Sequence, residues 1–148
     1  QEGAAMTVPV AEPTGAPTTE MAVGEESDLN AAKASFDSGD FAGAAQKLSA
    51  FAMAYPGSPL APEAEVMRGR ALAQQGDTRE AARAYLAGFS ANPAGPRAPE
   101  ALHLLGAALG TLGQTEQACI TLAEVGARFP GQPAAASAQA DMARLGCS

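Results

Sequence analysis

Two cysteines and one histidine have the most distinctive side-chain chemistry in this chain. Cys119 and Cys147 do not form a Cys-x-x-Cys pair, and together with His103 they supply too few ligands for a tetrahedral zinc site. We therefore predict no metal site. We predict instead a structural disulfide between the cysteines, with two buried, reduced thiols as the alternative. A bridge over a loop of this size contributes about 3 kcal/mol and indicates an oxidising compartment.

The single histidine gives no sign of catalysis. His103 is not accompanied by a recognisable serine or cysteine nucleophile motif, and the chain has no glycine-rich loop of the kind that holds phosphates. We therefore expect no enzymatic activity, no catalytic residue and no cofactor. His103 is then either part of a binding groove or an ordinary surface residue.

The charges of the chain are unevenly distributed. The formal net charge is −7, and residues 1–28 contain six acidic residues and no lysine or arginine, whereas the rest contains ten acids and nine bases. A chain without a basic face does not neutralise phosphates, which argues against nucleic acid as a partner. No apolar run reaches the 18 or more residues of a membrane-spanning helix, so we expect no membrane insertion.

A proline-rich turn occurs three times. It reads YPGSPLAPEA at 55–64, NPAGPRAPEA at 92–101 and FPGQPAAA at 129–136. A step of 37 residues relates these turns and also three glycines, Gly39, Gly76 and Gly113. A fixed period of this length is the signature of a repeat architecture, and 37 alanines among 148 residues favour helices.

Each repeat is predicted to be a pair of helices. The first helix of each pair is expected at about 29–38, 63–75 and 100–112, and the second at about 41–54, 78–91 and 115–128. The glycines suit left-handed helix ends, and Asp40 and Asp77 are expected to cap the second helices, with Glu80 completing a capping box. Pro62 and Pro99 suit the first turn of a helix.

These units resemble the tetratricopeptide repeat (TPR). The likeness depends on a small residue in the middle of each first helix and a large residue in each second helix; these are Ala32, Gly69 and Gly106, and Leu48, Tyr85 and Leu122. The resemblance implies an all-α TPR solenoid of three hairpins, at about 29–62, 63–99 and 100–133. A capping helix would follow at about 134–146, and residues 1–28 are expected to be a disordered linker.

Two segments of the sequence resemble one particular family of TPR proteins. The pattern YP-x-SP-x-AP-EA, and ACITLAEVGARFPGQPAA followed by RLGC, look like the C-terminal domain of the periplasmic YbgF/CpoB family of the Tol–Pal cell-division system in Gram-negative bacteria. Cys119 and Cys147 stand in that family's places. The family's architecture implies a removed signal peptide and an upstream coiled coil that is missing here. A homo-oligomer is expected only if that coiled coil exists.

The resemblance also implies a function. It predicts a periplasmic adaptor that coordinates outer-membrane constriction with peptidoglycan synthesis by binding a TolA-like protein and, in some members, a peptidoglycan synthase. Two alternatives remain open. The chain could be a TPR scaffold of another envelope assembly or secretion complex, or the regulatory module of an enzyme whose catalytic domain is missing.

The resemblance to TPR arrays places a groove along the first helices of the hairpins. The predicted groove residues are Leu29, Lys33, Phe36, Val66, Arg70 and His103. Lys33 and Arg70 occupy equivalent positions, so they would form a seat for an apolar segment flanked by acids, or for a C-terminal carboxylate. The alternative is that both cations are simply solvated and that Phe36 belongs to the core.

Overall fold

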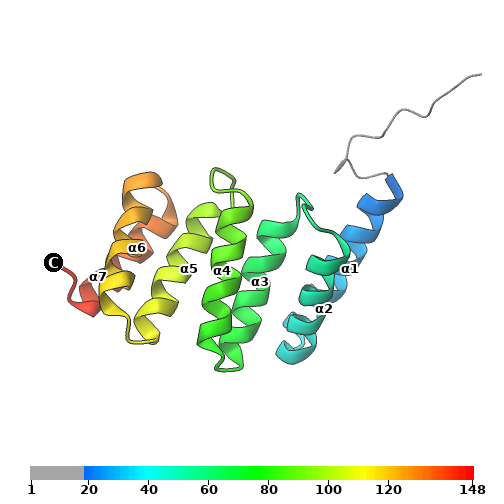
Figure 1. The fold of residues 1–148 in the computed structure, drawn as a ribbon, viewed down its shortest axis with the longest axis horizontal. Helices are drawn as coiled ribbons and strands as arrows, with labels where there is room; N and C mark the ends of the chain where they lie inside the picture. Colours follow the sequence, from blue (N-terminus) through cyan, green and yellow to red (C-terminus); the bar gives the residue numbers. More distant parts are fainter. Residues whose placement is uncertain (1–18) are drawn as a thin grey trace, which may run out of the picture.

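Residues 19–148 form seven α-helices that stand side by side in chain order (Figure 1). The computed structural model describes residues 19–148, and no strand occurs in this part of the chain. The helices are α1 (Thr19–Asp37), α2 (Phe41–Ala54), α3 (Ala61–Gln74), α4 (Thr78–Ala91), α5 (Ala98–Thr111), α6 (Thr115–Arg128) and α7 (Pro133–Leu145). None of them is both long enough and apolar enough to cross a membrane.

The helices form the predicted solenoid. The pairs α1 and α2, α3 and α4, and α5 and α6 are the three hairpins, and α7 packs on both α5 and α6. The second helices, α2, α4 and α6, have the predicted bounds. The helices α3 and α5 begin two residues earlier than expected, because each includes its proline in its first turn.

Left-handed glycines end the first helices, as predicted. Gly39, Gly76 and Gly113 have φ values of 87°, 81° and 81°. After each glycine, the next backbone N–H donates across the helix end to a carbonyl five residues earlier, as Asp77 does to Leu72. Each hairpin therefore turns by the same backbone geometry.

Two of the three second helices, α2 and α4, begin at side-chain caps, whereas α6 does not, and one predicted detail is wrong. Asp40 accepts from the backbone N–H of Gly43, and Asp77 from that of Glu80. Glu80 does not complete a capping box. Its carboxylate pairs with Arg83, and the N–H of Asp77 is already bonded at the preceding helix end.

Small residues let the helices of a hairpin approach closely. A Cβ atom added at Gly69 would lie 2.3 Å from the ring of Tyr85, and one added at Gly106 would lie 2.6 Å from Leu122. The small-and-large pairs seen in the sequence are therefore direct contacts between helices. They allow a chain rich in alanine to build a dense core.

The first helix is longer than predicted. It begins at Thr19, so the expected linker is wrong for residues 19–28, while residues 1–18 lie outside the described part of the chain. Glu25, only 4% exposed, accepts a hydrogen bond from the hydroxyl of Ser58, and Asp28 accepts one from Tyr55. These contacts with the first proline turn support the added turns of α1, whose own sequence lacks a clear apolar stripe.

Candidate partner-binding groove

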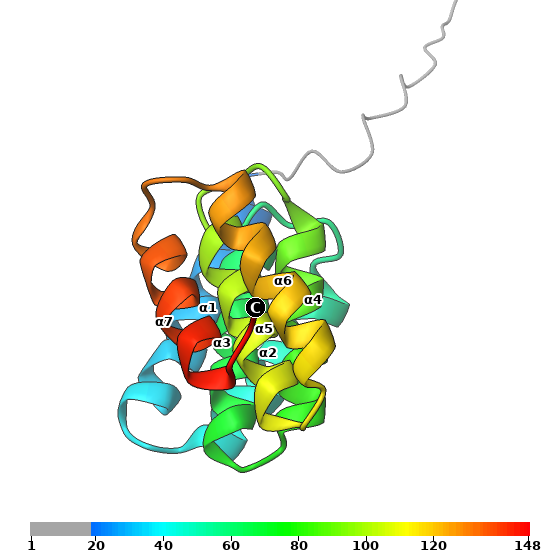
Figure 2. The same cartoon turned by 90° about the vertical axis from the view of Figure 1, so that its left-hand side faces the viewer.

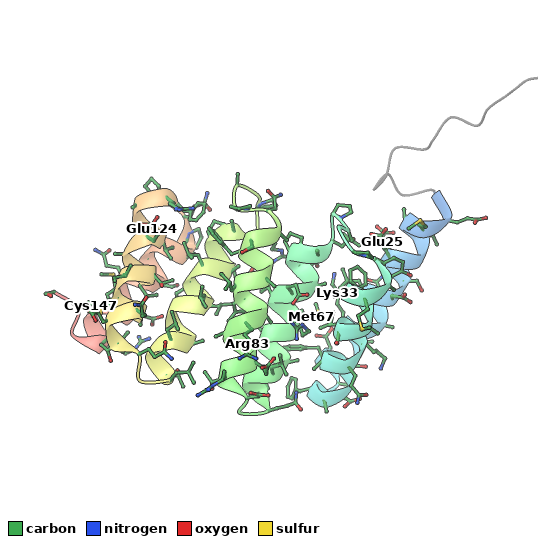
Figure 3. All side chains as sticks on the ribbon, in the orientation of Figure 1. Glu25, Lys33, Met67, Arg83, Glu124 and Cys147 are labelled. Atoms are coloured by element: carbon green, nitrogen blue, oxygen red, sulfur yellow. A yellow bond between two sulfur atoms is a disulfide. The ribbon has the colours of Figure 1, made fainter. Side chains whose placement is uncertain are left out.

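A hollow of about 290 Å³ lies on the side of the stack that α1, α3 and α5 form. Its lining residues are Lys33, Phe36, Asp37, Glu63, Val66, Met67, Arg70, Arg97 and Glu100. Figure 3 shows Lys33 of α1 and Met67 of α3 near each other in this region. The hollow thus brings together four of the six residues predicted for a groove, from α1 and α3. We call it the groove hollow.

The predicted residues differ in how they are placed. Val66 is buried and forms the floor, while Phe36 is half-buried and makes an edge-to-face contact with Phe41, with ring centroids 5.1 Å apart. Leu29 does not line the hollow. It is 3% exposed and packs in the core with Leu48, because it lies on the face of α1 that is turned toward α2.

Ion pairs join neighbouring first helices around the hollow. Lys33 Nζ lies 2.9 Å from Glu63 Oε2, and Arg70, at the equivalent position one repeat later, pairs with Glu100. Arg97 bridges the two acids, 3.5 Å from Glu63 and 3.2 Å from Glu100. The two cations that the sequence placed in the groove are thus already neutralised by acids of the same chain.

This network, which we call the ion-pair ladder, was not predicted from the sequence. Glu63 and Glu100 are separated by the same 37 residues as Lys33 and Arg70, and that shared step was the available signal. The two glutamates lie in the first turns of α3 and α5, where an acid also stabilises the helix dipole. A carboxylate from a partner would have to compete with them.

A buried tyrosine lies near the ladder. Burial raises the pKa of Tyr85, while nearby Arg70 lowers it and Glu100 raises it. Its hydroxyl therefore stays protonated at neutral pH. Tyr85 serves packing, through its contact with Gly69, rather than proton transfer.

His103 lies outside the groove hollow and joins α5 to α7. Its Nε2 is 2.8 Å from Oδ2 of the buried Asp141, which also pairs with Arg144. Burial lowers the pKa of His103, and the charges of Arg144 and Arg70 lower it further, against an opposite effect of Glu100. The imidazole is therefore neutral near pH 7 and donates its Nε2–H to Asp141.

The cysteines are joined as predicted. Cys119 of α6 and Cys147, just beyond α7, form a disulfide with their Cα atoms 5.6 Å apart. The alternative of two reduced thiols does not apply to this structure. In residues 19–148, no group of three or more histidine, cysteine or acidic side chains is arranged to hold a metal ion.

Comparison with known proteins bears on the fold. A family model described as a tetratricopeptide repeat matches residues 100–131, which span α5 and α6. No curated protein matches the chain. Among solved structures, the chain is similar to the Yersinia enterocolitica type III secretion chaperone SycD in complex with a peptide of the translocator YopD, at 13% identity and a TM-score of 0.71, over 86% of this chain and 93% of that one.

A second solved structure is also similar. It is the ArsTM double mutant of MamA RS-1, at 20% identity and a TM-score of 0.63, over 82% of this chain and 68% of that one. Identities this low bear on the fold alone. The chain contains a tetratricopeptide repeat and folds as a TPR-like solenoid, an architecture whose extended surfaces bind other proteins.

Proposed function

We propose that this TPR-containing chain is a non-enzymatic adaptor that binds a segment of a partner protein in the groove hollow. The observation that carries the proposal is the hollow itself, with an apolar floor of Phe36, Val66 and Met67 inside a charged rim. A small apolar site with polar groups around it is the usual form of a peptide-anchoring pocket. The similar chaperone SycD has been solved with a bound peptide, which supports the same use of the fold here.

The charges indicate which kind of partner segment fits. Because Lys33 and Arg70 are already paired with Glu63 and Glu100, an added acid would gain little, and exposed ion pairs are worth about 0–1 kcal/mol. An apolar side chain buried on the floor would contribute about 1.5–3 kcal/mol. A hollow of about 290 Å³ accommodates one large side chain of this kind. The partner would therefore present a single leucine, methionine or phenylalanine from an extended segment.

We further propose a place for this adaptor in the cell. The resemblance of the repeats to the YbgF/CpoB family supports a periplasmic role in the Tol–Pal system, with a TolA-like protein and a peptidoglycan synthase as partners. The disulfide is compatible with an oxidising compartment such as the periplasm. The adaptor would then coordinate outer-membrane constriction with peptidoglycan synthesis during division.

Binding to purified TolA domains tests both parts of the proposal. Phe36→Ala removes part of the floor and should weaken binding about tenfold or more, which corresponds to the loss of about 1.4 kcal/mol. Met53→Ala, on the outer surface of α2 where Met53 is 82% exposed, is the matched control and should bind as the unmodified chain does. Circular dichroism checks that each variant is folded.

A second variant tests the rim. Lys33→Glu combined with Arg70→Glu places like charges beside Glu63 and Glu100, and should disrupt the ladder and weaken binding. If the chain binds TolA domains but neither variant changes the affinity, the groove hollow is not the site. If the unmodified chain does not bind TolA domains, the assignment to the Tol–Pal system is wrong.

A further inference from the structure

The last helix of the stack, α7, is exposed over most of its surface. Gln132 provides no side-chain cap at its start, and its first turn has no acidic residue, whereas α3 and α5 carry Glu63 and Glu100 there. Of its residues, only Ala138 and Asp141 are buried. A helix of 13 residues is marginal without packing, so α7 depends on its contacts with α5 and α6.

Two surface hollows border α7. A hollow of about 710 Å³ lies between α6, the turn at residues 130–133 and α7, and another of about 240 Å³ lies between α5 and α7. The turn that leads into α7 contains Gly131, whose φ is 82°. Figure 2 looks onto this end of the stack, where α7 covers only one side of α6. As the end unit of the described stack, α7 contacts only α5 and α6, so it can separate from them while the helices further along keep their contacts.

The disulfide adds a covalent attachment to the packing of α7 on α5 and α6. Cys119 lies in the first half of α6, and Cys147 follows Gly146, whose left-handed conformation ends α7. The backbone N–H of Cys147 donates to Met142, so the end of α7 and the bond form one rigid piece. Both cysteines are half-buried, which leaves the bond within reach of a small thiol or an exposed dithiol.

A separated α7 would expose apolar residues. Leu102, Leu122 and Val125 of α5 and α6 are almost fully buried and pack against residues of α7, including Ala138. Asp141 and Arg144 would also leave the wall of the hollow beside α5. The state of the bond thus decides whether the C-terminal end of the stack is a closed cap or an open apolar surface.

We propose that the Cys119–Cys147 disulfide is a redox-operated latch on α7. A dithiol reductant breaks the Sγ–Sγ bond by thiol–disulfide exchange, transfers two electrons and two protons to the two cysteine sulfurs, and itself becomes a disulfide. The capping helix then separates from α5 and α6 while α1–α4 stay folded, because each unit of a solenoid contacts only its neighbours. This latch goes beyond the proposed adaptor function and needs no partner.

Hydrogen exchange measured by mass spectrometry tests the latch without a partner, so its outcome is independent of the proposed function. The unmodified chain is compared before and after treatment with dithiothreitol. The amides of residues 133–145 should exchange roughly 100-fold faster after reduction, while those of α1–α4 keep their rates. Equal protection of α7 in both states would overturn the proposal. An equal loss of protection throughout α1–α7 would also overturn it, because the bond would then stabilise the whole stack.

A double variant provides the control. Cys119→Ser combined with Cys147→Ser should show the fast α7 exchange of the reduced chain and should not respond to dithiothreitol. If this variant keeps the slow exchange of the oxidised chain, the bond does not hold α7 and the latch is excluded.

Discussion

At one end of the stack, α1 is attached through two carboxylates that reach the first proline turn, whereas at the other end α7 is attached through a sulfur–sulfur bond. Figure 3 shows Glu25 and Cys147 at these opposite ends. Glu25 bonds to Ser58 and Asp28 to Tyr55, while Cys147 bonds to Cys119. Each attachment closes an end helix onto a hairpin, but only the second depends on the redox state.

The two ends also differ in how they stop the repeat from continuing. A shift of the sequence by 37 residues aligns Ser27 and Asn30 of α1 with Ala64 and Met67 of α3. These two residues of α3 pack against the hydrophobic core of the preceding hairpin. In α1 these positions are exposed and polar, as a terminal repeat requires. In α7 the equivalent of Met67 is Asp141, which is buried and turned to His103. One end is closed by polar residues in contact with water, and the other by a buried polar pair and a covalent bond.

The largest expected effect is at the covalent end. Cys119→Ser combined with Cys147→Ser should lower the free energy of opening α7 by about 3 kcal/mol. Thermal denaturation followed by circular dichroism should show an early loss of the helix signal of α7, ahead of the main transition. The unmodified chain in dithiothreitol should show the same early transition, and its absence in both cases would show that the two ends do not differ in this way.

The second-largest expected effect on stability is at the α1 end of the stack. Ser58→Ala leaves the buried carboxylate of Glu25 without its hydrogen bond, which should cost about 1–3 kcal/mol. Chemical denaturation with and without reductant measures it. The loss should be the same under both conditions if α1 is independent of the disulfide. Ser58→Thr, which keeps a hydroxyl, is the control and should recover most of the stability.

The smallest effect concerns the histidine that supports α7. Because burial lowers the pKa of His103, the unfolded chain binds a proton more readily than the folded one as pH falls through about 6.5. Stability should therefore be complete above that pH and decrease below it. His103→Gln, which can still donate a hydrogen bond to Asp141 but does not titrate, should reduce this slope between pH 6.5 and 5. Denaturation midpoints of both chains, measured over that pH range, test the prediction. If the midpoints of the two chains decrease equally as the pH falls, His103 is not the cause of the pH dependence.

Much of the fold was predictable because it repeats. The 37-residue step located every turn, and Gly39, Gly76 and Gly113 located the helix ends to within a residue. The disulfide was also predictable, since two cysteines without metal ligands have few other uses. These features depend on residue type and spacing alone.

The features that were missed depend on contacts outside the repeat. Glu25 and Ser58 are 33 residues apart, a separation unrelated to the period, so nothing in the pattern joined α1 to the first turn. Leu29 was assigned to the groove by counting along the helix, but its side chain is turned to α2. The residues predicted for the groove stay a prediction until binding is measured.

The glycine at the end of α7 has one more consequence. Gly146 comes four residues before the position that another 37-residue step from Gly113 would reach, so α7 stops about one helical turn early. The residue after each earlier glycine, as at Asp40 and Asp77, starts the next helix. Here that residue is Cys147. A position that starts the next helix in the earlier repeats here forms the disulfide that joins the end of the chain to α6.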